Sequence, residues 1–141
     1  MSKCFLRAFE RLPSILVGLN EEFFKQAFGR HNKNLILNQR IVSKAGADEV
    51  ITNDRVFLLS CDEAKKYFSS NSLRISSNTD YAIERGSYNQ SGNGWWWLRD
   101  MGDSLLRASF VNTNGAIDSY GFSITSSNYS VRPAIWVNAS A

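Results

Sequence analysis

The sequence predicts an α+β fold, in which short N-terminal helices pack on a small twisted antiparallel sheet with long polar loops. Residues 5–28 place apolar side chains three and four positions apart, which is the periodicity of an amphipathic helix. Residues 55–59 form a short apolar run that is typical of a buried strand. Beyond Trp95, short strand candidates alternate with turn signals, and Asn114-Gly115 favours a hairpin.

The N-terminal periodic segment is expected to form two short helices. Pro13 divides it, because proline cannot donate to the helical hydrogen-bond ladder. Asn20 is a candidate N-cap of the second helix, with Glu21 and Glu22 in the first turn, where negative charge is favourable. We expect this helix to end near Gly29.

Two short strands are expected next, at Ile41-Val42 and Val50-Ile51, around the flexible Ala45-Gly46-Ala47. The buried strand over 55–59 then runs into Ser60-Cys61-Asp62-Glu63. This pattern is a capping box, in which the first and last side chains each satisfy a free backbone N–H group.

The capping box predicts a helix over about 61–68, and a second short helix is expected over about 79–85, starting at Asn78 or Thr79. Ser69-Ser70-Asn71-Ser72 is expected to end the first of these helices. Its inward-facing side chains are expected to be Ala64, Tyr67 and Phe68.

The last third of the chain contains three consecutive tryptophans followed by a polar segment. In a strand, alternate side chains face opposite ways, so Trp96 is expected to face away from Trp95 and Trp97. Arg99 and Arg132 are expected to pair with carboxylates or carbonyls and so to pin the sheet, with ligand binding as the secondary interpretation of both residues. The predicted structural frame comprises Trp96, Trp97, Arg99, Arg132, Pro133 and Trp136. The following strand candidates are Ser109-Phe110-Val111, Ala116-Ile117, Phe122-Ser123-Ile124 and Ala134-Ile135-Trp136-Val137.

The chain of 141 residues is the size of one domain, expected over 1–141. Its net charge is +3, but the basic residues are dispersed, so nucleic acid is not an expected partner. Lys3, Arg7, Glu10 and Arg11 interrupt the N-terminal segment, so neither a signal peptide nor a membrane-inserted segment is expected.

Candidate catalytic and metal-binding residues are few. His31 is the single histidine, and we interpret it as a surface residue because it lacks nearby partners. Cys4 and Cys61 have no metal-like spacing and are interpreted as packing residues. A reactive Cys61 is the alternative, because a helix N-terminus lowers a thiol pKa. We therefore predict no enzymatic activity, no catalytic residue, no metal site and no cofactor.

Three aspartates, Asp100, Asp103 and Asp118, are spread through the polar segment. Loop carboxylates of this kind supply calcium ligands in some proteins, but no calcium-binding motif surrounds them. Residues 112–130 consist mostly of Asn, Thr, Ser, Gly, Asp and Tyr. This composition is typical both of exposed hairpin turns and of adaptable binding surfaces, and by itself it leaves the two readings open.

Two motifs in the C-terminal half resemble those of an uncharacterised bacterial domain family. They are Trp96-Trp97-Leu98-Arg99 and Val131-Arg132-Pro133-Ala134-Ile135-Trp136. The resemblance covers roughly residues 15–138, and it includes Asp54-Arg55-Val56-Phe57-Leu58-Leu59-Ser60 upstream. Asp100-Met101 stands where that family has Ser-Pro, Ser130 stands where it has Gly, and the strands that precede the family's first helix are not evident here.

The resembled family is similar to C-type-lectin-like folds, including formylglycine-generating enzymes and the variable proteins of diversity-generating retroelements. In the variable proteins, a polar C-terminal segment is rewritten by adenine-directed mutation and serves as the binding face. The resemblance implies a non-enzymatic module that presents residues of about 100–130 to a protein or glycan ligand. The expected ligand-binding residues are Asp100, Asp103, Ser104, Asp118, Tyr120, Asn128 and Tyr129. The alternative is a structural or assembly domain of a larger surface or phage protein, with solvated polar loops.

Overall fold

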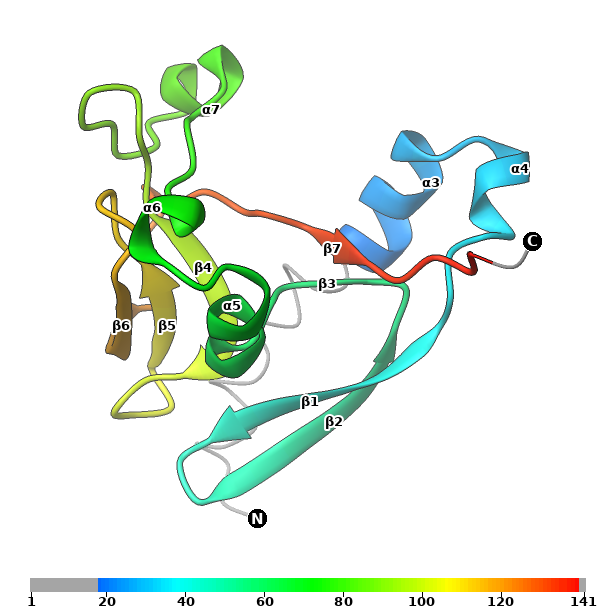
Figure 1. Cartoon of the computed structure of the whole chain (residues 1–141), viewed down its shortest axis with the longest axis horizontal. Coiled ribbons are helices and arrows are strands. Elements are labelled where there is room, and N and C mark those ends of the chain that lie inside the picture. The colour runs from blue at the N-terminus through cyan, green and yellow to red at the C-terminus, as the bar shows by residue number, and fades with distance from the viewer. Residues whose placement is uncertain (1–17, 140–141) are drawn as a thin grey trace.

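A computed structural model describes residues 18–139 of the chain, except for the side chain of His31. Its helices are η1 (Leu19–Phe23), α3 (Phe24–Ala27), α4 (Arg30–Lys33), α5 (Cys61–Tyr67), α6 (Asn71–Arg74) and α7 (Asp80–Glu84). Its strands are β1 (Gln39–Ala45), β2 (Asp48–Asp54), β3 (Val56–Phe57), β4 (Trp96–Met101), β5 (Arg107–Val111), β6 (Ile117–Ser123) and β7 (Ala134–Ile135). In Figure 1, strands β4, β5 and β6 lie at one end of the molecule and α3 and α4 at the other, with β3 and β7 running between them.

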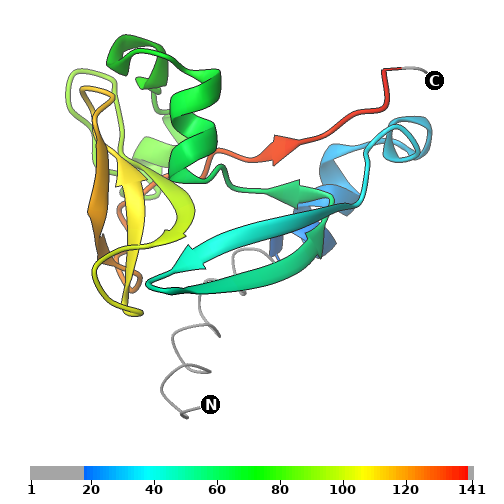
Figure 2. The same cartoon turned by 60° about the horizontal axis from the view of Figure 1, so that its bottom comes forward.

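The described strands form antiparallel sheets in the orders β4-β5-β6, β1-β2 and β3-β7. β3 pairs with β7 through Val56 and Ile135, so the C-terminal segment returns to the middle of the chain. Figures 1 and 2 both show the end of β1 next to the end of β4, where the backbone N–H of Lys44 donates to Asp100. The architecture is therefore α+β with antiparallel sheets, as the sequence predicts.

The core lies on both faces of β4, whose six residues are all buried. Trp97 and Met101 belong to the larger apolar cluster, whereas Trp96 and Leu98 belong to a second cluster that includes Ala64 of α5. Successive side chains of a strand face opposite ways, so the tryptophans are divided between the two clusters. This confirms the prediction that Trp96 faces away from Trp97.

The capping box before α5 is confirmed. The backbone N–H of Glu63 donates to Ser60 Oγ and that of Ser60 donates to Glu63 Oε2, both at 3.0 Å. Ala64 is fully buried, as expected. Tyr67 is 44% exposed, so its expected inward orientation is wrong; α5 ends at this residue, and the ring lies edge-on to Trp136.

Asn20 is not an N-cap. It lies inside η1, which begins after Gly18. The Asn20 side-chain amide donates to the carbonyl of Val56 at 2.8 Å, and its oxygen accepts from the backbone N–H of Arg55 at 2.8 Å. Asn20 therefore attaches the first described helix to the junction of β2 and β3. The helix expected before Pro13 lies outside the described residues. The region that precedes the family's first helix, in which no strands are evident from the sequence, also lies outside them.

Helices α4 and α6 were not expected from the sequence, whereas α7 was, with Thr79 as its cap. α6 forms in the serine-rich segment because distant contacts hold its last residue, Arg74. The buried Arg74 side chain donates from Nε to the carbonyl of Gly115 at 2.9 Å, and its own carbonyl accepts from Trp96 Nε1 at 3.0 Å. Tertiary hydrogen bonds therefore stabilise a helix that local propensity does not predict.

Candidate functional site

Strand β6 contains a bulge over residues 119–121. β5 and β6 pair at Ala108 and Phe122, and they pair again at Phe110 and Asp118. The three residues between these pairs on β6 therefore stand opposite a single residue of β5. A bulge bends its strand and redirects side chains, and bulges are frequent beside functional sites.

The bulge is held by hydrogen bonds and by close backbone packing. Asp118 Oδ1 accepts from the backbone N–H groups of Tyr120 and Gly121, each at 3.0 Å. The carbonyl of Tyr120 accepts from the N–H of Asp103 at 2.8 Å. Gly121 has φ of 78°, and a Cβ on Gly102 would lie 2.1 Å from the Tyr120 carbonyl oxygen, so both positions require glycine. The main chain at Tyr120 is thus fixed on both sides.

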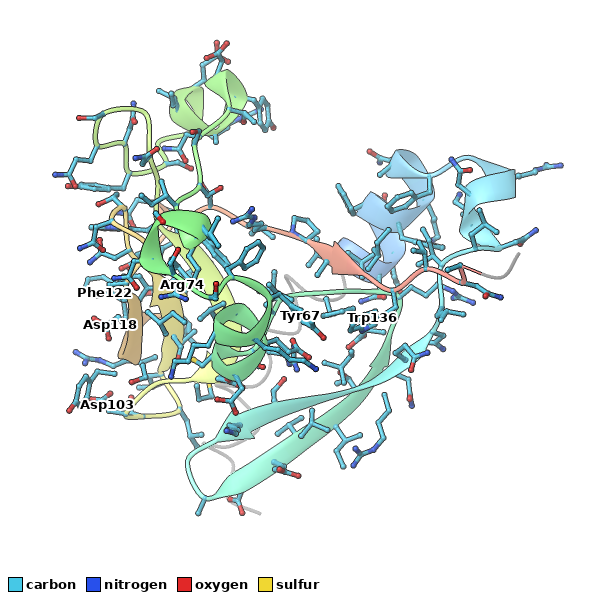
Figure 3. All side chains as sticks on the ribbon, in the orientation of Figure 1. Tyr67, Arg74, Asp103, Asp118, Phe122 and Trp136 are labelled. Carbon is cyan, nitrogen blue, oxygen red and sulfur yellow. The ribbon has the colours of Figure 1, made fainter. Side chains whose placement is uncertain are left out.

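The bulge displays Tyr120, which at 74% exposure is the most exposed of the large apolar and aromatic residues described. Phe122, two residues further along β6, is 46% exposed. Asp103 forms an ion pair with Arg107 at 3.3 Å, beside exposed Ser104. Figure 3 shows Asp103, Asp118 and Phe122 along one edge of the molecule, on β6 and on the loop between β4 and β5. We call this surface the β6 face; its residues are Asp103, Ser104, Asp118, Tyr120 and Phe122.

Asp100 does not belong to the β6 face, so its expected exposure is wrong. It is 3% exposed, and its two carboxylate oxygens accept from the backbone N–H groups of Lys44, at 3.0 Å, and Cys61, at 2.7 Å. Asp100 therefore attaches both β1 and the start of α5 to β4. Its role is structural, because the side chain is buried and its hydrogen bonds go to the main chain of two other segments.

Tyr129 is also buried, at 7% exposure, which corrects its expected place on an exposed face. The Tyr129 ring stacks on the Trp97 ring at a centroid distance of 4.0 Å. It also stacks on the Phe122 ring, at a centroid distance of 5.7 Å. Burial, together with a smaller effect of the Asp118 charge, raises the pKa of the Tyr129 hydroxyl to about 12. Asn128 is half-buried, and its carbonyl accepts from the N–H of Tyr88 at 2.8 Å.

Arg99 plays the expected role in the structural frame. Its guanidinium donates to the carbonyl of Val42 at 2.9 Å, to the carbonyl of Leu58 at 2.8 Å, and to both carboxylate oxygens of Glu63. One buried side chain thus connects β4 with β1, with the segment after β3 and with α5. The prediction that Arg99 pairs with carboxylates and carbonyls is confirmed.

Arg132 has different surroundings from those expected. Its guanidinium carbon lies 4.9 Å from the ring centroid of Phe68 and 5.1 Å from that of Trp96. Its Nη1 atom is buried and has no hydrogen-bond partner in the described part of the chain. The expected carboxylate or carbonyl partner is therefore wrong, and cation–π contacts with two rings take its place.

Arg132, Pro133 and Trp136 line a pocket of about 300 Å³. We call it the aromatic pocket; residues 132–136 form one side, and Phe57, Leu59, Tyr67 and Phe68 complete it. Figure 3 shows Tyr67 and Trp136 near each other at the centre of the molecule, well away from Asp103 and Asp118. The β6 face and the aromatic pocket are thus separate surfaces.

The chain matches a known protein family over most of its length. A family model described as "Domain of unknown function (DUF6273)" matches residues 15–139. The chain belongs to this family. No curated protein and no solved structure shows a significant match to this chain. The matched residues of this DUF6273 domain include both the β6 face and the aromatic pocket.

Cys61 of this DUF6273 domain lies at the start of α5, and the pKa of its thiol is raised. Burial raises the pKa of the Cys61 thiol to about 11, although it opens α5. The thiol is therefore protonated near neutral pH, which opposes the reactive-cysteine alternative. Cys4 lies outside the described residues. Within residues 18–139, with the His31 side chain excepted, no three His, Cys, Asp or Glu side chains gather as metal ligands, and no helix is long and apolar enough to cross a membrane.

The sequence does not indicate that Phe122 belongs to the β6 face, because its pattern predicts only a strand residue there. It also does not indicate that Arg107 pairs with Asp103 of this face. The bulge itself has a sequence signal, because a glycine inside a strand pattern marks a bulge, and an aspartate three residues before it satisfies the displaced N–H groups. Asp118 and Gly121 of this DUF6273 domain carry that signal.

Proposed function

We propose that the chain is a non-enzymatic binding module with a C-type-lectin-like fold, which presents the β6 face to a protein or glycan ligand. The observation that carries the proposal is the bulge, which holds Tyr120 at 74% exposure on a fixed main chain. A large side chain exposed on a pre-organised backbone loses little conformational freedom on binding. Tyrosine also combines a rigid apolar ring with a hydrogen-bonding hydroxyl.

The surroundings of Tyr120 support this proposal. Phe122 adds a second exposed ring, and the ion pair between Asp103 on the β4–β5 loop and Arg107 at the start of β5 supplies polar groups beside it. Binding surfaces commonly combine aromatic anchors with a polar rim. β6 is also the edge strand of the described β4-β5-β6 sheet, so its outer side is not paired within that sheet.

The finer proposal is that the β6 face belongs to a segment diversified by a retroelement. Positions that vary must be exposed, because substitution of core residues would unfold the frame. We therefore expect variation at Asp103, Ser104 and Tyr120, and none at buried Asp100 and Tyr129. Deep sequencing of codons 95–138 in a growing source population tests this. Adenine-directed substitutions confined to exposed positions support it, whereas a uniform rare background removes diversification.

The binding proposal itself is tested with two tyrosine variants. Tyr120 and Tyr81 are exposed at 74% and 65%, but Tyr81 lies on α7, away from the bulge. The wild-type domain, Tyr120→Ala and Tyr81→Ala are screened in parallel against a glycan array and a displayed library of extracellular proteins. We expect ligands of the wild type to be retained by Tyr81→Ala and lost by Tyr120→Ala.

Two outcomes contradict the β6 face as the binding surface. Ligands that Tyr120→Ala retains at full affinity bind elsewhere. The absence of any saturable ligand, with all three proteins folded, favours the alternative of a structural or assembly domain. Circular dichroism of each variant excludes unfolding as the cause of lost binding.

A further inference from the structure

The aromatic pocket has features of a ligand site that are independent of the β6 face. Its volume of about 300 Å³ is at the lower end of the range found for small-molecule sites. Trp136 stacks on Phe57 at a centroid distance of 6.4 Å and meets the edge of Tyr67 at 6.0 Å. Trp136 and Tyr67 remain 40% and 44% exposed, so the pocket opens to solvent between them.

The polar group of this pocket is the guanidinium of Arg132. The rings of Phe68 and Trp96 hold it in place, at 4.9 and 5.1 Å. A buried donor without a partner is costly, and this cost is larger for a charged donor. The carboxylates that line the neighbouring core already have partners, since Glu63 binds Arg99 and Asp100 binds two backbone N–H groups. Arg132 itself forms no ion pair with a carboxylate of the described residues, so the wall of the pocket carries a positive charge without a counter-ion from that part of the chain.

We propose that the aromatic pocket binds a small organic acid, whose apolar body lies against Trp136 and Tyr67 and whose carboxylate accepts from Arg132. A charge-assisted bond from a guanidinium to a carboxylate is among the stronger hydrogen bonds in proteins. The other lining residues are apolar or aromatic and Arg132 is the one cationic residue among them, so the pocket suits a monoanion with a ring better than a phosphate, which requires several donors. The volume accommodates one aromatic ring with a short acid chain.

The test compares 3-phenylpropionate with the neutral 3-phenylpropionamide, which has nearly the same shape. Isothermal titration calorimetry of the full chain measures both. We expect the acid to bind saturably and the amide to bind about tenfold more weakly, because the charge-assisted bond is lost. In Arg132→Met the two affinities should become equal, whereas Tyr67→Ala should weaken both and leave their ratio unchanged.

Matched controls separate this inference from the proposed function. Tyr120→Ala, on the β6 face, should leave the affinity for 3-phenylpropionate unchanged. A variant that loses ligands at the β6 face should still bind the acid in the aromatic pocket. The experiments can therefore contradict one proposal without contradicting the other. If Arg132→Met does not fold, the acid-to-amide ratio of the wild type still decides, because it needs no substitution.

Three results would overturn the inference. The first is an absence of saturation by the acid, and the second is equal binding of acid and amide by the wild type. The third is a result in which the peptide acetyl-Gly-Gly-Phe, with a free C-terminal carboxylate, binds saturably and 3-phenylpropionate does not. That result would assign the pocket to the end of a polypeptide and exclude a small acid.

Discussion

Arg99 of β4 and Glu63 of α5 form an ion pair in which both Nη atoms of the guanidinium donate to the two carboxylate oxygens, with Nη2 and Oε1 2.9 Å apart. The Arg99 side chain is 6% exposed and that of Glu63 is 24% exposed. Glu63 also accepts from the N–H of Ser60 in the capping box. One carboxylate therefore joins the start of α5 to the central strand of the core.

Replacement of Glu63 by alanine should lower the free energy of unfolding by about 3 kcal/mol, because it leaves the buried Arg99 charge without its carboxylate. Urea denaturation at pH 7 measures the change. Asp62→Ala is the control, since this neighbouring carboxylate also lies in the first turn of α5 but pairs with Lys44 at the surface. Surface pairs contribute little, so the control should remain near wild type. Equal losses in both variants would contradict a special role for Glu63.

Acid should destabilise the domain through the same carboxylate. Burial acts to raise the pKa of Glu63, but the hydrogen bonds from Arg99 and Ser60 outweigh it, and the net pKa is lowered from 4.5. The carboxylate therefore contributes its full stability above pH 4.5, and this contribution is lost as the pH falls through the lower, folded-state pKa. Urea midpoints measured from pH 7 to pH 3 should fall less steeply for Glu63→Gln than for the wild type. Parallel curves would show that other groups dominate acid unfolding.

Replacement by alanine should reduce the stability of the domain far more at Tyr129 than at Tyr120. Tyr129→Ala removes a ring that stacks on Trp97 and should cost about 3 kcal/mol of stability. Tyr120→Ala removes a ring that is 74% exposed and should change stability by less than about 0.5 kcal/mol. Thermal and urea unfolding of both variants measure this difference. A large loss for Tyr120→Ala would show that its ring contributes to packing.

The bulge in β6 should depend on Gly121 for steric reasons. Gly121 and Gly46 have φ of 78° and 68°, but a Cβ on Gly121 would lie 2.6 Å from the carbonyl oxygen of Ala108, whereas one on Gly46 meets nothing within 4 Å. Gly46→Ala should cost about 1 kcal/mol, from the positive φ alone. Gly121→Ala should cost about 3 kcal/mol, because backbone atoms must also move. Equal costs, measured by urea denaturation, would mean that the bulge adapts freely.

Cys61 should react slowly with thiol reagents. Burial raises the pKa of its thiol to about 11, so little thiolate exists at pH 8. In a Cys4→Ser background, labelling by iodoacetamide at pH 8 should be slower for the folded chain than for the chain in urea. The rate should rise as the pH approaches 11. Faster labelling of the folded chain than of the unfolded chain would support the alternative of a reactive Cys61.

Local patterns in the sequence determined much of the fold. The capping box at Ser60, the strands on either side of Gly46 and the alternation of Trp96 and Trp97 follow from interactions within a few residues, and all three are present in the structure. These features are readable because hydrogen bonds to nearby backbone groups and the two-residue period of a strand need no distant partner.

The tertiary structure alone decided which polar residues are exposed. Asp100 and Tyr129 lie in a polar segment, yet one accepts from Lys44 and Cys61 and the other packs on Trp97. Arg132 likewise lies between rings from α5's end and β4, which no local pattern specifies. Burial and pairing depend on neighbours far along the chain. The sequence therefore determined the elements of this domain, and their packing decided that Tyr120 is exposed and that Arg132 lies against two aromatic rings.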